Sequence, residues 1–277
     1  MLWVEYVTLA RLQFGVSSLQ VVRALFHIGT LRLQLRHYPL ALEKFAEAAA
    51  VAHGLHADAM AAGDGASTEE VSNQLALVLE GLGVVCTKMK RWDDAASHLD
   101  DALALSRDRP STTALVARAE LHCARMQYED GLKLLDQAFK ARGGVEDEHS
   151  ARIFAAQAKI KMRQLHLLQE YLLELEPALQ AASSVKLELQ QKSLEAEREG
   201  LPHDGSALAQ LEADVGEMSR SKEKIEGQCR SVVDGAHGLL KRGLQCAGSD
   251  SEQGVKIGQR LAELEELRGK FSWLSAS

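Results

Sequence analysis

Proline and aromatic residues are scarce in this chain of 277 residues, which has four prolines and 5% aromatic residues. Proline interrupts helices because it lacks a backbone N–H, and β-branched and aromatic residues favour strands. The chain shows no run of alternating β-branched residues, and it is rich in Ala, Leu, Glu and Gln, which favour helix. The composition therefore predicts an all-α protein.

Long hydrophobic runs and a surplus of positive charge are also missing. No segment approaches 18 uninterrupted apolar residues, so we expect no membrane span. Residues 1–15 lack a basic start and contain Glu5, so they do not have the pattern of a secretory signal. The formal net charge of −7 argues against a nucleic-acid-binding protein, which normally carries a basic stripe. We therefore expect neither a membrane nor a nucleic acid as partner.

Patterns typical of enzymes and metal sites are absent as well. The sequence contains no GxxxxGK[ST], GxSxG or HExxH motif. His53 and His56 share a helix face but have no third ligand at a matching spacing. The four cysteines form no CxxC pair, so we expect reduced thiols and a cytoplasmic location; they are Cys86, Cys123, Cys229 and Cys246. The sequence predicts no catalytic residue, no cofactor and no metal.

Three stretches of the first half share one pattern of small and large side chains. Gly29, Gly83 and Ala119 occupy equivalent positions, preceded by a leucine at four residues and followed by an aromatic at nine. Small, large and small residues then follow at fixed offsets. The equivalent sets are Leu25, Leu79 and Leu115; Tyr38, Trp92 and Tyr128; Ala41, Ala95 and Gly131; Phe45, Leu99 and Leu135; and Ala48, Ala102 and Ala138. Two antiparallel helices need small residues where their backbones approach and a large one to fill the gap, so the pattern predicts helix pairs.

This pattern resembles the tetratricopeptide repeat (TPR), whose period is about 34 residues. The resemblance covers residues 1–145 and implies a short helical solenoid with a concave face that holds other proteins. The spacing between the first two repeats is longer than one period. The surplus falls in residues 54–68, which we expect to be a loop or an extended helix end.

A further likeness concerns the stretch Leu9-Ala10-Arg11-Leu12-Gln13-Phe14-Gly15, followed by a short link to Val21-Val22. It is similar to a junction of kinesin-light-chain-type repeats and of ciliary TPR proteins, including those like tetratricopeptide repeat protein twenty-three. This likeness implies a structural component of a ciliary or flagellar axonemal complex, within the cytoskeleton. The alternative is a soluble cytosolic TPR adaptor for cargo or signalling partners.

Residues 146–277 follow a different pattern, which predicts a second domain of long helices. Two seams have residues at alternating spacings of three and four, as in coiled coils, and all of them except Lys222 are apolar. The first is Leu165, Leu168, Leu172, Leu175 and Leu179; the second is Leu208, Leu211, Val215, Met218, Lys222, Ile225, Cys229, Val232, Ala236 and Leu239. A turn at 201–206 joins them into an antiparallel hairpin. Pro177 is expected to kink the first helix, and a break at 243–254 precedes a last helix over 255–274.

The inner faces of the first helices of the repeats would line the groove in a TPR stack. The candidate partner-binding residues there are Arg23, Phe26, Leu33, Leu77, Glu80, Lys88, Val116 and Glu120. Chaperone-binding TPR domains clamp a carboxylate with basic and amide groups, whereas Glu80 and Glu120 would repel one. The apolar members predict that a partner helix, the chain's own long helix, or neighbouring helices of the stack cover them. We expect partner proteins to bind through helical or extended segments, in the groove and along the coiled coil, within a large complex.

Overall fold

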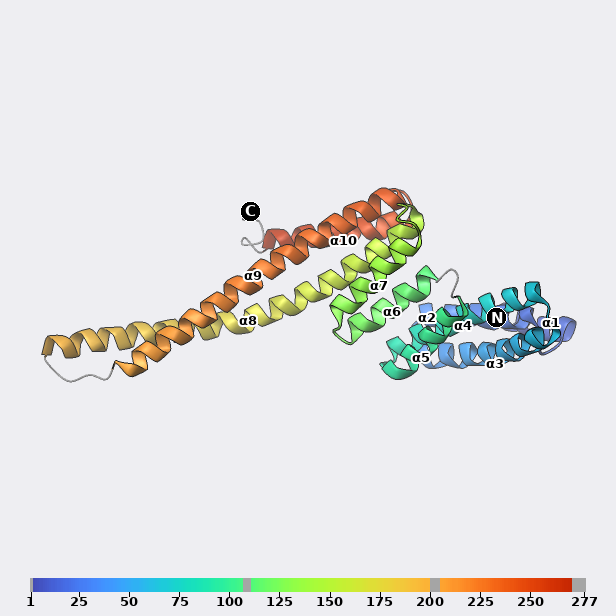
Figure 1. The fold of residues 1–277 in the computed structure, drawn as a ribbon, viewed down its shortest axis with the longest axis horizontal. Helices are drawn as coiled ribbons and strands as arrows, with labels where there is room; N and C mark the ends of the chain where they lie inside the picture. Colours follow the sequence, from blue (N-terminus) through green and yellow to red (C-terminus); the bar gives the residue numbers. More distant parts are fainter. Residues whose placement is uncertain (1, 107–110, 200–204, 271–277) are drawn as a thin grey trace. The chain divides into compact units, whose positions relative to one another are not determined.

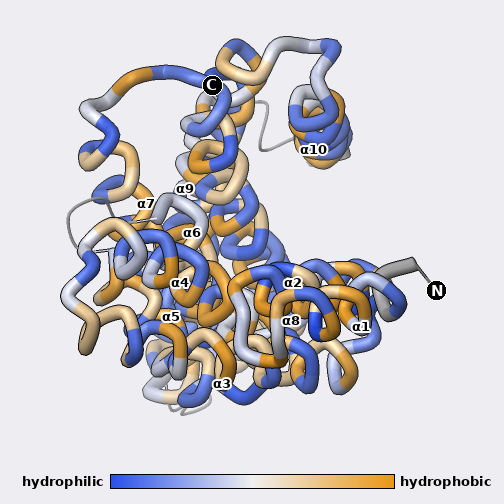
Figure 2. Tube along the Cα trace, turned by 90° about the vertical axis from the view of Figure 1, so that its right-hand side faces the viewer, coloured by the Kyte–Doolittle hydropathy of each residue, from blue (hydrophilic) through white to orange (hydrophobic). Residues whose placement is uncertain are grey.

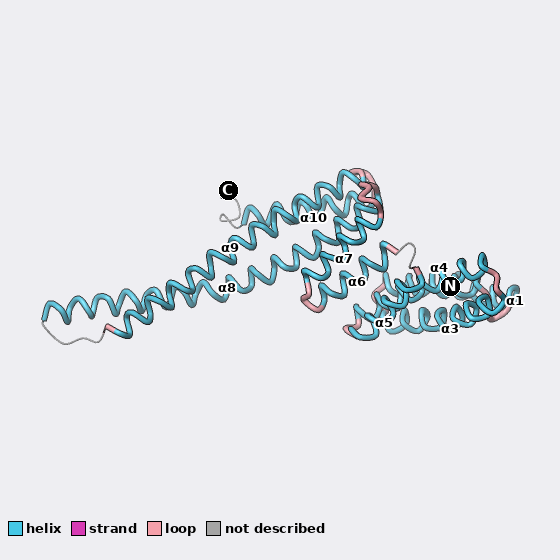
Figure 3. Tube along the Cα trace, in the orientation of Figure 1, coloured by secondary structure: helices cyan, strands magenta, loops and turns pink. Residues whose placement is uncertain are grey.

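The computed structural model describes residues 2–106, 111–199 and 205–270, and in these ranges all regular structure is helical, with no strand (Figures 1 and 3). The helices are α1 Leu2–Phe14, α2 Leu19–Gln34, α3 Tyr38–Ala62, α4 Gly65–Lys88, α5 Trp92–Leu105, α6 Thr112–Ala124, α7 Tyr128–Ala141, α8 Glu148–Glu199, α9 Ser206–Ala247 and α10 Glu252–Lys270. The prediction of an all-α protein is confirmed. The chain divides into two compact units, residues 1–156 and 157–277.

Helices of the first unit pack in sequential antiparallel pairs, α2 with α3, α4 with α5, and α6 with α7 (Figure 1). The first helices of the pairs also contact one another, α2 with α4 and α4 with α6. Within the described residues, no such contact joins the second helices α3 and α5, or α5 and α7. The first helices therefore form the more closely spaced layer, which is the inner face of a helical-repeat stack.

The turns inside the three pairs have the same backbone conformation. Each contains one non-glycine residue with positive φ, namely Arg36 at 59°, Lys90 at 61° and Met126 at 62°. In each turn the next backbone N–H donates to the carbonyl five residues earlier, at distances of 2.8–2.9 Å; these pairs are His37 to Arg32, Arg91 to Cys86 and Gln127 to His122. This is the hydrogen bond of a Schellman helix end. The three predicted repeats therefore match in backbone geometry as well as in sequence.

Small residues lie where the paired helices approach, as the pattern predicted. A Cβ at Gly29 would lie 2.8 Å from the Cδ1 of Phe45, and one at Gly83 would lie 2.5 Å from the Cγ of Leu99. Phe45 also fills the space beside Gly81 of α4, where a Cβ would lie 2.7 Å from its Cε1. Phe45 and Leu99 are fully buried, so there is no room for larger side chains at these contacts.

Replacing Gly83 with leucine is expected to lower the free energy of unfolding by about 2–3 kcal/mol, because the added atoms overlap Leu99. The matched control is Gly54→Leu, since Gly54 lies on α3 with no atom near its Cβ position and is exposed. The control should gain about 0.5–1 kcal/mol from helix propensity. Urea denaturation followed by circular dichroism compares the two variants. Equal effects would show that the helices do not approach through Gly83.

Residues 54–68, the surplus between the first two repeats, form extended helix ends around a tight turn. Helix α3 continues to Ala62 and α4 begins at Gly65. Gly63 turns the chain with φ of 70°, and the Asp64 side chain caps α4 by accepting a hydrogen bond of 3.4 Å from the backbone N–H of Ser67. The sequence analysis expected either a loop or an extended helix end here, and the region forms extended helix ends.

The second unit contains residues 157–199 of α8 together with α9 and α10. Helices α8 and α9 run antiparallel, as three contacts show: residues further along α8 contact residues nearer the start of α9. Gln190 donates to Glu212 at 2.9 Å, the Nζ of Lys222 lies 2.8 Å from Glu176, and Lys161 packs against Gly235. Hydrophobic and hydrophilic residues alternate along the turns of α9 and α10 that can be followed in Figure 2. No residue of the two predicted seams is exposed.

The boundaries in this unit differ in detail from the expected ones. Pro177 lies inside α8, and its predicted kink stays a prediction. The break before α10 is shorter than predicted, since α9 ends at Ala247 and α10 begins at Glu252. In α10, Ile257 and Leu264 are buried, as a packed face requires. Most of the predicted turn at 201–206 and the end of the last expected helix, residues 271–274, lie outside the described residues.

Candidate functional site

The layer of first helices presents rows of equivalent residues, one from each repeat. The row that lies six residues before the anchors Gly29, Gly83 and Ala119 is exposed in all three repeats and consists of Arg23, Leu77 and Thr113. Leu77 keeps 42% of its surface accessible. Helix geometry places the next row, three residues further on, beside it on the same face; this row is Phe26, Glu80 and Val116.

Phe26 and Leu33 belong largely to the core of the first pair. Both are half-buried and pack against the main hydrophobic cluster. The ring of Phe26 lies 5.7 Å from that of Phe45 at an interplanar angle of 57°. Neighbouring helices of the stack therefore bury much of these two side chains, as one of the three possibilities in the sequence analysis expected.

The charged candidates are spread along the layer and are not brought into one cluster. Arg23 is exposed, and its guanidinium lies 2.7 Å from Glu70 of α4. Lys88 is exposed at the last turn of α4. Val116 and Glu120 of α6 are half-buried. An exposed ion pair such as Arg23–Glu70 contributes at most about 1 kcal/mol, so it leaves Arg23 accessible to a partner.

Leu77 and Glu80 are brought together in a pocket between α4, the end of α5 and the start of α6. The pocket has a volume of about 220 Å³. Its polar lining comes from Asn73, Glu80, Ser106 and Ser111, and its apolar lining from Ala76, Leu77, Ala102 and Ala114. Sequence reasoning found Leu77 and Glu80 but missed the serines. Ser111 was recognisable only as a residue type that caps helices, and it does cap α6, accepting from the Ala114 N–H at 3.2 Å.

Glu80 is the unusual group of this pocket, because a carboxyl group there has lost nearly all contact with water. Its residue is 8% exposed, whereas the equivalent positions hold the apolar side chains of Phe26 and Val116. Its one described hydrogen bond comes from the Ser111 hydroxyl, which donates to Oε2 at 3.3 Å. Burial raises the pKa of Glu80 to about 7, and the Ser111 hydrogen bond lowers it by a smaller amount. Such a strongly raised pKa in a cleft marks a candidate functional group.

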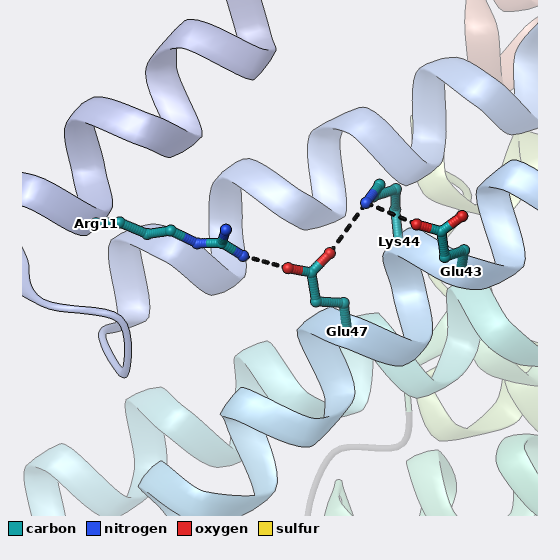
Figure 4. Close-up of polar contacts among 4 residues, drawn as sticks. All are labelled: Arg11, Glu43, Lys44 and Glu47. Carbon is teal, nitrogen blue, oxygen red and sulfur yellow. Dashed lines mark hydrogen bonds and ion pairs between the residues drawn. The ribbon is translucent and has the colours of Figure 1, made fainter.

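A second pocket, of about 260 Å³, lies between α1, α2 and α3. A chain of charged groups borders it, in which Arg11 of α1 pairs with Glu47 of α3 and Lys44 bridges Glu47 and Glu43 (Figure 4). The Lys44 Nζ lies 2.9 Å from Glu43 and 3.1 Å from Glu47. Because its cations and anions are paired with one another, this cluster links α1 to α3.

Groups suited to catalysis or metal binding do not converge in the described part of the chain. No three or more His, Cys, Asp or Glu side chains lie there close enough together to hold a metal ion. The four cysteines, all in the described ranges, form no disulfide with one another. Burial raises the pKa of Cys229 to about 11 and also that of Cys86, so neither thiol is activated as a nucleophile. Among the described helices, none combines the length and apolarity that a membrane crossing requires.

Stacked antiparallel helix pairs with matching turns and small residues at their contacts define a TPR-like helical repeat. No protein-family model matches the chain, and no curated protein does. Several solved structures are similar, and two of them serve as examples. A Bacteroides ovatus protein is 13% identical, with 89% of this chain and 98% of that one covered and a TM-score of 0.31. A tetratricopeptide repeat protein from Parabacteroides merdae is 12% identical, with 94% and 90% covered and a TM-score of 0.29. TM-scores this low carry no inference about this chain.

Proposed function

We propose that this protein is a non-enzymatic scaffold whose layer of first helices, in residues 1–145, binds a segment of another protein. One observation carries this proposal: exposed Leu77 and buried Glu80 stand side by side at an open pocket on the inner face of the stack. A partly exposed leucine gains from burial, up to about 1.5–3 kcal/mol for a side chain that is fully exposed beforehand. The polar pocket beside it would fix the position and identity of the bound segment.

A buried acidic side chain is itself an argument for binding. The equivalent residues Phe26 and Val116 show that apolar side chains suit this position in the stack. A glutamate with a strongly raised pKa destabilises the fold whenever it is charged. Proteins keep such destabilising groups mainly where function needs them.

Leu77→Asp tests the proposed surface. This variant should reduce partner capture at least about tenfold, because an aspartate placed beside Glu80 adds a charge and removes the apolar contact. The matched control is Leu40→Asp on α3, where Leu40 is 46% exposed and the two other repeats carry Asp94 and Asp130 at the equivalent position. Quantitative affinity purification from cells compares both variants with the wild type. Equal retention of the same proteins by both variants would exclude the layer of first helices as the binding surface.

We further propose that the scaffold belongs to a ciliary or flagellar axonemal complex. The support is the junction sequence Leu9–Gly15, with its likeness to ciliary TPR proteins, and the long helices of the second unit. Helix α9 alone has 42 residues and a length of about 63 Å. If the seams of α8 and α9 form a coiled coil, the pair would hold a second partner along its length.

Extraction from isolated cilia tests this location. A structural component should resist detergent and leave the axoneme only in high salt or denaturant. A soluble cytosolic adaptor for cargo or signalling partners would wash out at the detergent step or be absent from cilia. The second outcome would remove the axonemal role and leave the binding surface untouched.

A further inference from the structure

Among the described residues that line the pocket around Glu80, one is acidic and none is basic. Its acidic member is inside the protein, since Glu80 is 8% exposed. Its single described partner is a neutral hydroxyl, that of Ser111 at 3.3 Å. In the described part of the chain, no charged side chain contributes to the shift of the Glu80 pKa, which comes from burial and Ser111. A buried carboxylate without a cation is destabilised, and a cation that enters the pocket would relieve this.

Groups that can accept hydrogen bonds also line the pocket. Asn73 contributes an amide from α4, and Ser106 and Ser111 contribute hydroxyl groups from the end of α5 and the cap of α6. The Ser106 hydroxyl donates to the Ala102 carbonyl at 3.0 Å, and the Ser111 hydroxyl donates to Glu80. The Ser111 oxygen also accepts from the Ala114 N–H, so it keeps one lone pair for a ligand, and the Ser106 oxygen keeps its lone pairs as well. An ammonium or guanidinium group carries only donors and matches such a set.

The rest of the pocket lining is apolar. Ala76 and Leu77 of α4, Ala102 of α5 and Ala114 of α6 line it with methyl and methylene groups. Lysine and arginine bury their aliphatic stems along apolar surface while their charged ends reach polar groups. The volume of about 220 Å³ lies below the roughly 300–1,000 Å³ of sites for whole small molecules, and it suits a single side chain.

We propose that this pocket binds a cationic side chain, lysine or arginine, presented by the partner segment, with Glu80 as its counter-ion. The inference rests on the proposed function, since it names the chemistry by which the layer of first helices recognises its partner. Leu77 then covers the aliphatic stem, and the neighbouring backbone of the partner lies along α4 and α6. The same carboxylate repels partner segments that carry an acidic residue at this position.

Capped alanine peptides with a single central residue test the proposal with the full chain. One peptide carries lysine, one arginine and one norleucine, which keeps the aliphatic stem of lysine and removes its charge. Chemical shifts of the isotope-labelled protein should show that a cationic peptide binds at least about tenfold more tightly than the norleucine peptide, or about 1.4 kcal/mol. Glu80→Gln should remove this preference, whereas Glu70→Gln, an exposed carboxylate of the same helix, should retain it.

The titration of the Glu80 carboxyl, followed by carbon NMR, gives an independent readout. Saturation with the cationic peptide should lower the pKa of Glu80 from about 7, because a nearby positive charge favours the carboxylate. The chain also carries Arg107 and Arg109, which lie outside the described residues. If the free protein shows a normal or low pKa that rises in an Arg107→Gln/Arg109→Gln variant, the counter-ion is internal and the proposal is wrong.

The outcomes separate this inference from the proposed function. Equal binding of all three peptides, or no binding at millimolar concentration, would overturn the cation pocket. If Leu77→Asp still abolishes partner capture in that case, the scaffold function stands with a different mode of recognition. If Leu77→Asp and Leu40→Asp retain the partner equally while the peptides discriminate, the pocket stands as a cation site and the proposed partner surface falls.

Discussion

Replacing Phe45 with alanine is expected to lower the free energy of unfolding by about 3–5 kcal/mol. Phe45 is 1% exposed and lies between two glycines from different helices, Gly29 of α2 and Gly81 of α4. Its loss opens a cavity where α2 and α3 of the first pair meet α4 of the next repeat. The surrounding backbone is held by hydrogen bonds within its helices, so it collapses only partly into the space.

Phe14→Ala is the matched control for Phe45→Ala. Phe14 ends α1 and is 49% exposed, so its truncation should change the free energy of unfolding by less than about 1 kcal/mol. Chemical denaturation measured by circular dichroism gives both values. If both substitutions lower the free energy of unfolding by the same amount, the packing of Phe45 against the glycines of two repeats does not hold the first unit together.

Replacing Glu80 with glutamine is expected to stabilise the protein at high pH. The pKa of Glu80 is raised from 4.5 to about 7 in the folded state, so the folded protein holds a proton that the unfolded chain releases. The stabilisation that this bound proton gives to the folded state is therefore complete below about pH 4.5 and is lost as the pH rises through about 7. The shift corresponds to about 3 kcal/mol across this window. Glutamine resembles the protonated form and does not titrate.

Unfolding of the wild type and Glu80→Gln, measured from pH 4 to pH 8, tests this expectation. The difference in free energy should grow by about 2–3 kcal/mol in favour of glutamine as the pH rises. Glu70→Gln provides the control, since its exposed ion pair with Arg23 should contribute no more than about 1 kcal/mol. A constant difference between Glu80→Gln and wild type would show that Glu80 is not buried as described.

The helix pairs were predictable from the sequence because close packing leaves a local record. Gly29, Gly83 and Ala119 mark the points of approach, and the large residues that fill them follow at fixed offsets. The seams of α8 and α9 were predictable for the same reason, since the spacing of their residues indicates which face of each helix is shielded from solvent. These features depend on periodicity, which a single sequence contains.

The turns of the repeats could not be predicted in the same way. Arg36, Lys90 and Met126 share the left-handed conformation but have no side-chain type in common. Glycine is the usual signal for this conformation, and it is missing at all three positions. The hydrogen bonds that end α2, α4 and α6 hold these residues in place, so their conformation follows from the helix pair as a whole.

The degree to which each side chain on the layer of first helices is buried could not be predicted from the sequence either. Offsets from the anchors gave the side on which Phe26, Leu33 and Glu80 lie but not how much of each is covered. Phe26 is covered by Phe45, which comes from the second helix of its pair. Glu80 is covered at the junction with Ser106 and Ser111, where the next repeat approaches α4. Both effects depend on contacts between helices, which periodicity along one helix does not record.

Photo-crosslinking from position 77 in living cells tests most directly the claim that the layer of first helices is occupied by another protein. A benzoyl-phenylalanine at Leu77 should form a crosslink to a defined partner, and the same group at Leu40 on α3 should not. Sequencing the crosslinked peptide should place a lysine or arginine within a few residues of the attachment point. Crosslinks of equal yield from both positions, or from position 40 alone, would contradict the account.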